Sequence, residues 1–213
     1  MAESTRIRLS TPGRERRSHA TRTAQTRSRV IEAVIESIGE VGYQRTTSAE
    51  IARRAGVTWG AVQHHFGGKE GLLIAVVEYS FNRFAERLDD IPPERVSLEK
   101  RAGLFIDRAW EHFGSSLYRS TFEILLNQMG GADAGESPDW QREMFRAWNG
   151  VWMRLFGDSQ LSRRQQLALQ HYTISTLSGL ASTLMLAGED TLLRHSELDL
   201  LKDTLVRELI RDD

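Results

Sequence analysis

The sequence contains no cysteine. This absence excludes disulfide bonds, a thiolate nucleophile and zinc sites with thiolate ligands. A chain without cysteine suits a reducing compartment, and the amino terminus also lacks the apolar core of a signal peptide, so we expect a cytoplasmic protein. Only four prolines and few alternating runs of β-branched residues are present, which favours helices over strands.

Long uncharged segments are also scarce. The longest, Gln165 to Gly188, is twenty-four residues and could span a membrane by length alone. Its three glutamines, His171 and many Ser and Thr residues argue against a bilayer environment. We expect instead a helix buried on most sides by protein, and no membrane partner.

Sequence patterns of catalytic sites are absent as well. We find no Gly-rich phosphate loop before a helix, no H-E-x-x-H pair and no nucleophile elbow. The adjacent His64 and His65 would diverge by about 100° on a helix and could not chelate one ion together. His112 and His171 are spaced too loosely to predict a metal site. We therefore expect no enzymatic activity, no cofactor and no metal.

The net charge of −1 conceals two oppositely charged parts. Residues 1–70 hold twelve Lys and Arg against seven Asp and Glu, a net charge of +5, and the other 143 residues hold sixteen against twenty-two, a net charge of −6. This asymmetry indicates that a polyanion would be contacted by the first third of the chain.

Two short helices are predicted within the basic part. Thr47 to Glu50 read T-S-A-E, a capping box in which the Thr47 hydroxyl takes the Glu50 amide and the Glu50 carboxylate reaches back to the Thr47 amide. Gly56 is suited to end this helix in the left-handed conformation. Thr58 is then a good N-cap for a second helix, Trp59 to His65.

The second helix has two distinct faces. Val62 and Phe66, four residues apart, form an inner face, whereas Trp59, Gln63 and His64 point outward. Two short helices joined by a tight Gly-containing turn are typical of a helix-turn-helix, whose second helix enters the major groove of DNA. An ordinary helical hairpin is the alternative, but it would not explain the exposed Trp, Gln and His.

The residues A-x-x-G-V-T, followed by H-F-G-G-K-E-x-L-L, resemble the DNA-binding domain of the tetracycline-repressor (TetR) family of bacterial regulators. The resemblance covers roughly residues 25 to 80, and its most specific part is Val62 to Leu73. Gln63 departs from the family, most members of which have an aromatic residue there, usually tyrosine. The resemblance implies an all-α fold with an N-terminal three-helix helix-turn-helix DNA-binding domain and a C-terminal helical ligand-binding and dimerisation domain.

The predicted division of the chain has three parts. Residues 1–22, rich in Arg, Ser and Thr, are expected to form a disordered basic arm, either a passive tail or a contact to phosphate or the minor groove. Residues 23–90 form the DNA-binding domain with a fourth, connecting helix from near Lys69 to about Asp89. Residues 91–213 form the second helical domain.

The resemblance and the exposed face together give the candidate DNA contacts. The base-facing candidates are Trp59, Ala61, Gln63 and His64. The phosphate candidates are Tyr43, Thr47, Thr58, His65 and Lys69.

Aromatic residues are concentrated after residue 100. Most should form core, but proteins that resemble this chain hold a mostly apolar small-molecule cavity among these helices. The candidate ligand-binding residues are Phe105, Trp110, Phe113, Tyr118, Phe122, Trp148, Trp152, His171 and Tyr172. A ligand among Phe105, Trp110, Trp148 and Trp152 would shift the far end of the connecting helix.

Two sets of residues near the carboxyl end predict a symmetric dimer, in which each subunit contributes the same two helices. One is a ridge of small residues at helical spacing, Ser175, Ser178, Gly179 and Ser182; the other is a leucine stripe, Leu201, Leu205 and Leu209. The alternative is that these helices complete the core of one chain.

We interpret the sequence as a homodimeric bacterial transcription regulator, a repressor that binds pseudo-palindromic double-stranded operator DNA and is released by a small apolar or aromatic effector. A dimeric architectural DNA-binding protein without an effector is the alternative, and an all-α enzyme is a remote one.

Overall fold

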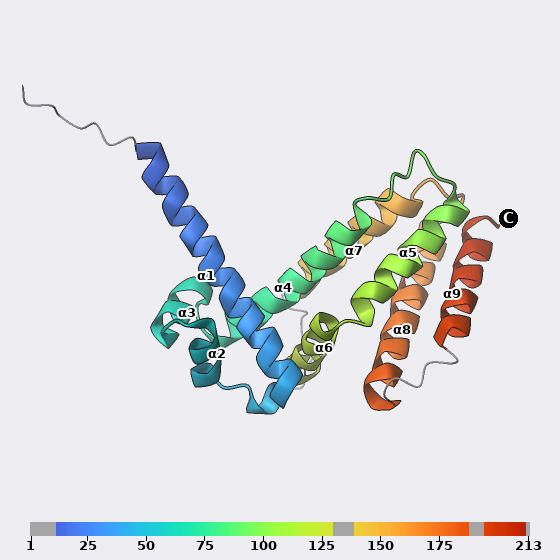
Figure 1. The fold of residues 1–213 in the computed structure, drawn as a ribbon. Helices are drawn as coiled ribbons and strands as arrows, with labels where there is room; N and C mark the ends of the chain where they lie inside the picture. The colour runs from blue at the N-terminus through green and yellow to red at the C-terminus, as the bar shows by residue number, and fades with distance from the viewer. Residues whose placement is uncertain (1–11, 130–138, 188–193, 212–213) are drawn as a thin grey trace, which may run out of the picture.

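The computed structural model describes residues 12–129, 139–187 and 194–211. These residues form nine α-helices and one 3₁₀ turn and contain no strand, which confirms the all-α prediction. The elements are α1 (Pro12–Val41), η1 (Tyr43–Arg45), α2 (Ser48–Ala55), α3 (Trp59–Phe66), α4 (Lys69–Leu88), α5 (Leu98–Phe113), α6 (Ser116–Met129), α7 (Asp139–Phe156), α8 (Arg163–Ala187) and α9 (Arg194–Leu209) (Figure 1). None of these helices is long and apolar enough to cross a membrane.

The helices form two groups. Figure 1 shows α1, α2 and α3 at one end of the molecule and α5, α8 and α9 at the other. The connecting helix α4 runs from the first group towards the second, with α7 packed against it. Helix α6 contacts α1, α4 and α5, so it also lies between the two groups.

The first hydrophobic core lies among α1 to α4. Helix α1 carries an apolar stripe that is buried at Val30, Val34 and Ile38, and Val62 of α3 is fully buried against it. Full burial of an aliphatic side chain contributes about 1.5–3 kcal/mol, so this stripe supports the two short helices, which could not form alone. Ile124 of α6 also belongs to this core, so the first group is not closed off from the second.

The second core is larger and joins α4 to α5 through α9. Phe84 and Leu88, near the end of α4, are fully buried in it with Phe105 of α5 and Trp152 of α7. Helix α4 thus belongs to both cores. A division of the chain at residue 90 stays a prediction.

The ends of α2 and α3 follow the predicted caps. The Thr47 hydroxyl accepts a hydrogen bond from the Glu50 amide at 3.2 Å, and the Thr58 hydroxyl accepts one from the Ala61 amide at 3.2 Å. Such caps contribute about 1 kcal/mol each. Gly56 ends α2 in the left-handed conformation with φ 63°, and α3 extends one residue past the predicted end, to Phe66.

One part of the predicted capping box is wrong. The Glu50 carboxylate accepts hydrogen bonds from Arg53 and Arg54, which follow it within one helical turn. Two guanidinium groups form charge-assisted hydrogen bonds with a carboxylate, and these are stronger than a bond from a neutral backbone amide.

The predicted disordered arm is also wrong for residues 12–22, which belong to α1. Pro12 occupies the first position of the helix, where its fixed φ suits helix initiation. No proline follows within α1, so nothing in the backbone chemistry stops the helix before the apolar stripe. Residues 1–11 of the predicted arm lie outside the described residues.

Candidate functional site

The exposed face of α3 is narrow and polar. Gln63 and His64 are exposed, Ala61 is partly exposed, and Val62 between them is buried. Trp59, predicted to point outward, instead packs part of its side chain against the first core. An indole ring is large enough to cover core residues and still reach solvent at its edge. Gln63 and His64 are therefore the side chains of α3 most available to a partner.

Three of the predicted phosphate candidates lie near one another. The Lys69 ammonium group donates to the Thr46 carbonyl oxygen at 3.3 Å and lies 5.5 Å from the centre of the Tyr43 ring. Thr47 follows Thr46 directly, so Tyr43, Thr47 and the positive end of Lys69 form one corner at the start of α2 and α4. Thr58 lies separately, at the start of α3, where its hydroxyl is the N-cap.

Arg27 of α1 is a residue of this region that the sequence did not predict. Its guanidinium group lies 4.4 Å from the centre of the Phe66 ring and donates a hydrogen bond to the His65 carbonyl oxygen. Both contacts join α1 to the last turn of α3. The carbonyl groups of that turn lack helical partners, so a cation there is stabilised by the negative end of the helix dipole. Sequence spacing gives no indication of this contact, because it joins residues 38 positions apart.

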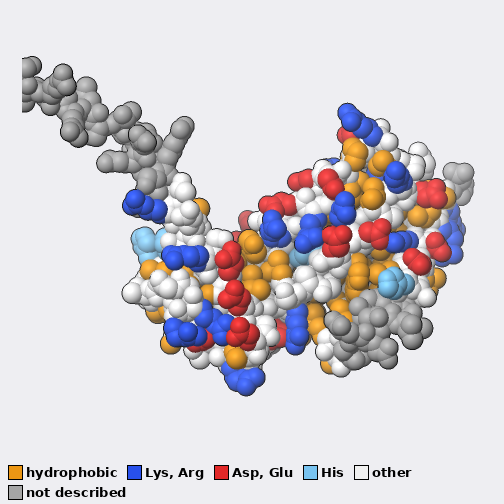
Figure 2. Space-filling view, in the orientation of Figure 1, with side chains coloured by type: hydrophobic (Ala, Val, Ile, Leu, Met, Phe, Trp, Pro, Cys, Tyr) orange, Lys and Arg blue, Asp and Glu red, His pale blue; other side chains and the backbone are white. Residues whose placement is uncertain are grey.

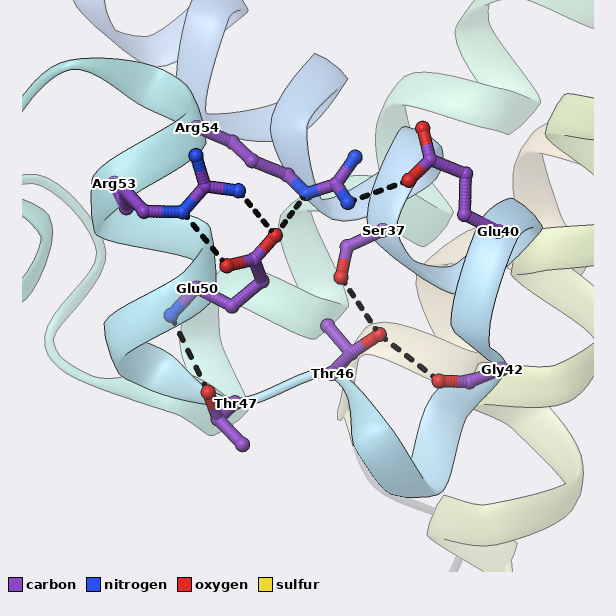
Figure 3. A network of polar contacts seen from close by, with 8 residues as sticks. All are labelled: Ser37, Glu40, Gly42, Thr46, Thr47, Glu50, Arg53 and Arg54. Carbon is purple, nitrogen blue, oxygen red and sulfur yellow. Dashed lines mark hydrogen bonds and ion pairs between the residues drawn. The ribbon is translucent and has the colours of Figure 1, made fainter.

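An ion network connects α1 to α2 (Figure 3). Arg54 lies between two carboxylates, bonding to Glu50 at 2.5 Å and to Glu40 at 2.5 Å. Hydrogen bonds from Arg53 and Arg54 lower the pKa of Glu50 to about 2, and Arg54 also lowers the pKa of Glu40. All four side chains therefore remain charged at neutral pH.

A second polar contact closes the turn between the same two helices. The Thr46 hydroxyl is buried, donates to the Gly42 carbonyl oxygen at 3.0 Å and lies 3.1 Å from the Ser37 hydroxyl (Figure 3). Gly42 has φ 79°, a conformation that favours glycine. This turn fixes the position of Thr47 and so the direction in which α2 begins.

On the face shown in Figure 2, Lys and Arg side chains, a His and several acidic side chains lie over the end formed by α1 to α3. Over the other helices, basic and acidic side chains are interspersed.

A cavity of about 690 Å³ opens beside the second core. Helices α4, α5, α6, α7 and α8 line it, and its walls are mostly apolar, including Phe81, Phe84, Leu125 and Ile174. Its volume and lining are typical of small-molecule sites in proteins.

The cavity also has polar groups at its walls. The Tyr118 hydroxyl donates to the Ser178 hydroxyl at 3.0 Å, and burial raises the Tyr118 pKa. His112 is buried with its ring 5.1 Å from that of Phe84. Burial lowers the pKa of His112 to about 4, with a smaller contribution from Arg87, so its imidazole is neutral near pH 7. Among the described residues, no group of three His, Asp or Glu side chains is placed to hold a metal ion.

Four of the nine predicted ligand-binding residues line this cavity: Phe113, Tyr118, Trp148 and His171. Phe105 and Trp152 do not, because they pack edge to face at 5.9 Å inside the second core. The cavity therefore lies nearer to α4 and α6 than the site predicted among Phe105, Trp110, Trp148 and Trp152.

The lining of the cavity differs from the predicted ligand-binding residues at other positions too. Trp110, Phe122 and Tyr172 are not among the lining residues. The prediction missed Phe81 and Phe84 of α4 and the buried Gln170 of α8. The helical spacing of these three residues indicated that they are buried. It did not indicate which helices enclose a cavity. Contact with a ligand stays a prediction for all of these residues.

The predicted dimer residues separate into two sets. Leu201, Leu205 and Leu209 are buried within one chain, where α9 packs against α5, so they complete the core and are not available to a partner. Their spacing of four residues places them on one face of α9, which indicates burial but not the identity of the covering surface.

The small-residue ridge on α8 is more accessible. Ser175 and Gly179 are exposed, whereas Ser178 and Ser182 are partly buried. The exposed face of α8 continues through Tyr172 and Thr183 to Leu186, which is 90% exposed. This face stays the predicted contact between subunits.

Residues 30–76 match the family model described as "Bacterial regulatory proteins, tetR family". The match spans the end of α1 through the first two turns of α4, which is the part of the chain built around the first core. This segment of the chain belongs to the tetR family. The predicted resemblance is confirmed.

Individual tetR-family relatives cover more of the chain. Over 142 residues it is 49% identical to "HTH-type transcriptional regulator BetI" of Escherichia coli O45:K1, an alignment that covers 67% of this chain and 61% of that protein. It is 30% identical over 79 residues to the "Fatty acid metabolism regulator protein" of Bacillus subtilis, covering 37% of this chain and 41% of that protein. The chain thus spans less than two thirds of the length of either relative. Both of these relatives are regulators and not enzymes.

The fold is also that of solved regulators. A crystal structure of the transcriptional regulator FadR from Bacillus subtilis, in complex with stearoyl-CoA, aligns with a TM-score of 0.62 at 17% identity, covering 86% of this chain and 97% of that chain. At this identity the likeness shows the fold alone.

Proposed function

We propose that this protein is a homodimeric, operator-binding repressor of transcription that a small molecule releases from DNA. The match of residues 30–76 to the tetR family carries this proposal, because it coincides with the core that presents Gln63 and His64 on α3. Binding to chromosomal DNA would place the protein in the bacterial cytoplasm.

In the proposed complex α3 lies in the major groove. Gln63 can bond bidentately to adenine, and His64 lies beside it on the exposed face. The corner of Tyr43, Thr47 and Lys69, together with Thr58 and His65, would contact phosphates and fix the orientation of α3. Two copies would read half-sites separated by about one helical turn, roughly 34–36 Å.

The proposed effector site is the cavity, since it lies against both helices that lead to the first core. Phe84 of α4 and Thr121 and Leu125 of α6 line it, while Val76 of α4 and Ile124 of α6 lie in the first core. A ligand that favours one arrangement of α4 and α6 would change the separation of the two α3 helices. Coupling of about 1–3 kcal/mol would weaken DNA binding roughly 5- to 150-fold.

The proposed subunit contact is the exposed face of α8, from Tyr172 to Leu186. Small residues such as Ser175 and Gly179 allow a partner helix to approach closely, and a two-fold axis would pair the same face of each subunit. An architectural DNA-binding protein would use this dimer without an effector, and the cavity is the feature that favours a regulator.

A binding selection tests the proposal. The purified full-length protein is mixed with a pool of random double-stranded DNA, and bound DNA is amplified and sequenced over several rounds. We expect a pseudo-palindrome with half-sites about one helical turn apart. A double variant, Gln63→Ala with His64→Ala, should lose the enrichment, while Arg83→Gln on the outer surface of α4 should retain it. Enrichment without two-fold symmetry, or none at all, would contradict the proposed function.

A further inference from the structure

The charge of the cavity lining has one sign. Among the described residues that line the cavity there are two arginines, Arg146 of α7 and Arg163 of α8, and no Asp or Glu. Both arginines are exposed, so they lie where the cavity meets solvent. Neither forms an ion pair with an acidic side chain in the described part of the chain. A negatively charged ligand would meet attraction here, and a positively charged one would meet only repulsion.

The inner wall of the cavity does not suit a charge. Phe84, Phe113 and Trp148 line it, and the buried His112 among them is neutral near pH 7 because burial lowers its pKa to about 4. Burying an unpaired charge among these side chains would cost far more free energy than a solvent-exposed ion pair contributes. An ionised group of a ligand therefore belongs at the mouth, and its apolar part belongs inside.

Gln170 supplies a second, independent indication of a ligand. It lines the cavity, its side chain is only 4% exposed, and its amide nitrogen has no hydrogen-bond partner among the described residues. A buried donor without an acceptor is unfavourable, and most buried polar groups in proteins are paired. An acceptor oxygen on a ligand would satisfy this donor.

The cavity is long in one direction. Its lining residues on α8 run from Arg163 to Ser178, which is about 22 Å along a helix that rises 1.5 Å per residue. A lining of this length fits an extended molecule better than a compact one.

We infer that the effector is an amphipathic carboxylate, with an extended apolar part buried against Phe84, Phe113 and Trp148 and its carboxylate at the mouth beside Arg146 or Arg163. Gln170 donates a hydrogen bond to an acceptor oxygen of the same molecule. This inference rests on the proposed function, since it names the chemical class of the molecule that the cavity takes.

Isothermal titration calorimetry on the full-length protein tests the class with three probes of equal chain length: decanoate, decanol and decyltrimethylammonium, each below its micelle-forming concentration. We expect decanoate to bind most tightly, by about tenfold over the ammonium probe. Arg146→Gln or Arg163→Gln should weaken decanoate about two- to fivefold and leave decanol unchanged. Arg164→Gln is the matched control, because Arg164 is exposed beside Arg163 but does not line the cavity.

The role of Gln170 has its own test. Gln170→Leu should weaken decanoate about two- to tenfold. It should leave the thermal stability of the unliganded protein unchanged or raised, since the amide nitrogen has no partner to lose. A fall in stability with unchanged decanoate affinity would assign Gln170 a purely structural role and overturn this part of the inference.

The outcomes separate the inference from the proposed function. Equal or tighter binding of the ammonium probe, no binding of decanoate, or no effect of either arginine variant would overturn the carboxylate class. If the ammonium probe nevertheless released the selected operator, the proposed function would stand without this ligand class. If decanoate bound as expected but no operator were selected, the proposed function would fail and the ligand class would remain.

Discussion

The Glu123 carboxylate of α6 accepts a hydrogen bond from the Tyr43 backbone amide at 2.9 Å, across 80 positions of sequence. Tyr43 begins η1, the turn that leads into α2, and its ring lies beside the Lys69 ammonium group. One carboxylate of α6, the helix that lies between the two groups, is therefore bonded directly to the corner that we propose contacts phosphate.

Further contacts strengthen this connection. Asn127 of α6 accepts a hydrogen bond from the Gln44 side chain at 2.6 Å, and Ser120 donates to the Ile35 carbonyl oxygen at 3.1 Å. Tyr118 and Thr121 of the same helix line the cavity. Helix α6 thus joins the cavity to the first core directly, in addition to the connection that the sequence predicted through α4.

We expect Glu123→Ala to weaken the response to ligand more than it weakens DNA binding. The change removes a charge-assisted hydrogen bond between α6 and η1, so a shift of α6 would be transmitted less completely to η1. Urea unfolding should show a loss of about 1–2 kcal/mol. The coupling is measured by titrating the selected operator with and without a saturating cavity ligand, with the exposed Glu78→Ala as control. An unchanged ratio of the two affinities would leave α4 as the connection.

Gln63→Ala should relax base preference at one position in each half-site. A bidentate amide–adenine pair gives roughly 1–3 kcal/mol of discrimination, which alanine cannot supply. Lys69→Ala should instead weaken all sequences about equally and reduce the salt dependence, because a phosphate contact carries no base information. The measurement is a binding selection for each variant at two salt concentrations. An unchanged preference for Gln63→Ala would show that this residue does not read bases.

The features that the sequence predicted correctly are local ones. Thr47 and Thr58 cap the residues three positions after them, and Gly56 needs only its own backbone freedom to end α2. The burial of Val30, Val34 and Ile38 along one face of α1 follows from helical periodicity alone. Such features require no knowledge of the rest of the fold, so propensity and spacing were sufficient.

The features that could not be predicted depend on packing between distant segments. Arg27 reaches His65, and Glu123 reaches Tyr43, only because three helices meet at particular angles. The leucines of α9 had the correct spacing for burial. That spacing does not indicate whether α5 of the same chain or a second subunit covers them. The cavity is a space left by imperfect packing, so aromatic residues near one another in sequence, such as Phe105 and Trp152, could fill the core instead.

Gly179→Glu should favour monomers. Gly179 is exposed, and a Cβ atom placed there meets nothing within 4 Å in one chain, so the substitution is compatible with the subunit fold. At a close helix contact across a two-fold axis it would bring two carboxylates together and leave them without partners. Sedimentation velocity should show the change in mass, and DNA affinity should fall because the half-sites are no longer bound by one molecule.

Gly150→Glu is the matched control for this prediction, since Gly150 is also an exposed helical glycine with nothing within 4 Å of a Cβ. It should remain dimeric. An intact dimer for Gly179→Glu would place the subunit contact elsewhere than on the ridge of α8.

The buried His112 should make stability depend on pH. Its pKa falls from 6.5 to about 4 in the folded protein because burial disfavours the charged imidazole. Between these two values the unfolded chain binds more protons than the folded one, so this residue's contribution to stability is present above pH 6.5 and is lost as the pH falls towards 4. We expect the loss to be about 2–3 kcal/mol.

His112→Gln removes this titration while keeping a polar side chain of similar size. The free energy of unfolding in urea is measured for both proteins from pH 7 to pH 4 at one protein concentration. The carboxylates titrate in both, so their effect cancels in the difference, and the wild-type protein should lose about 2–3 kcal/mol relative to the variant. Parallel profiles for wild type and His112→Gln would mean that His112 reaches water or an acidic partner and is not held neutral by burial.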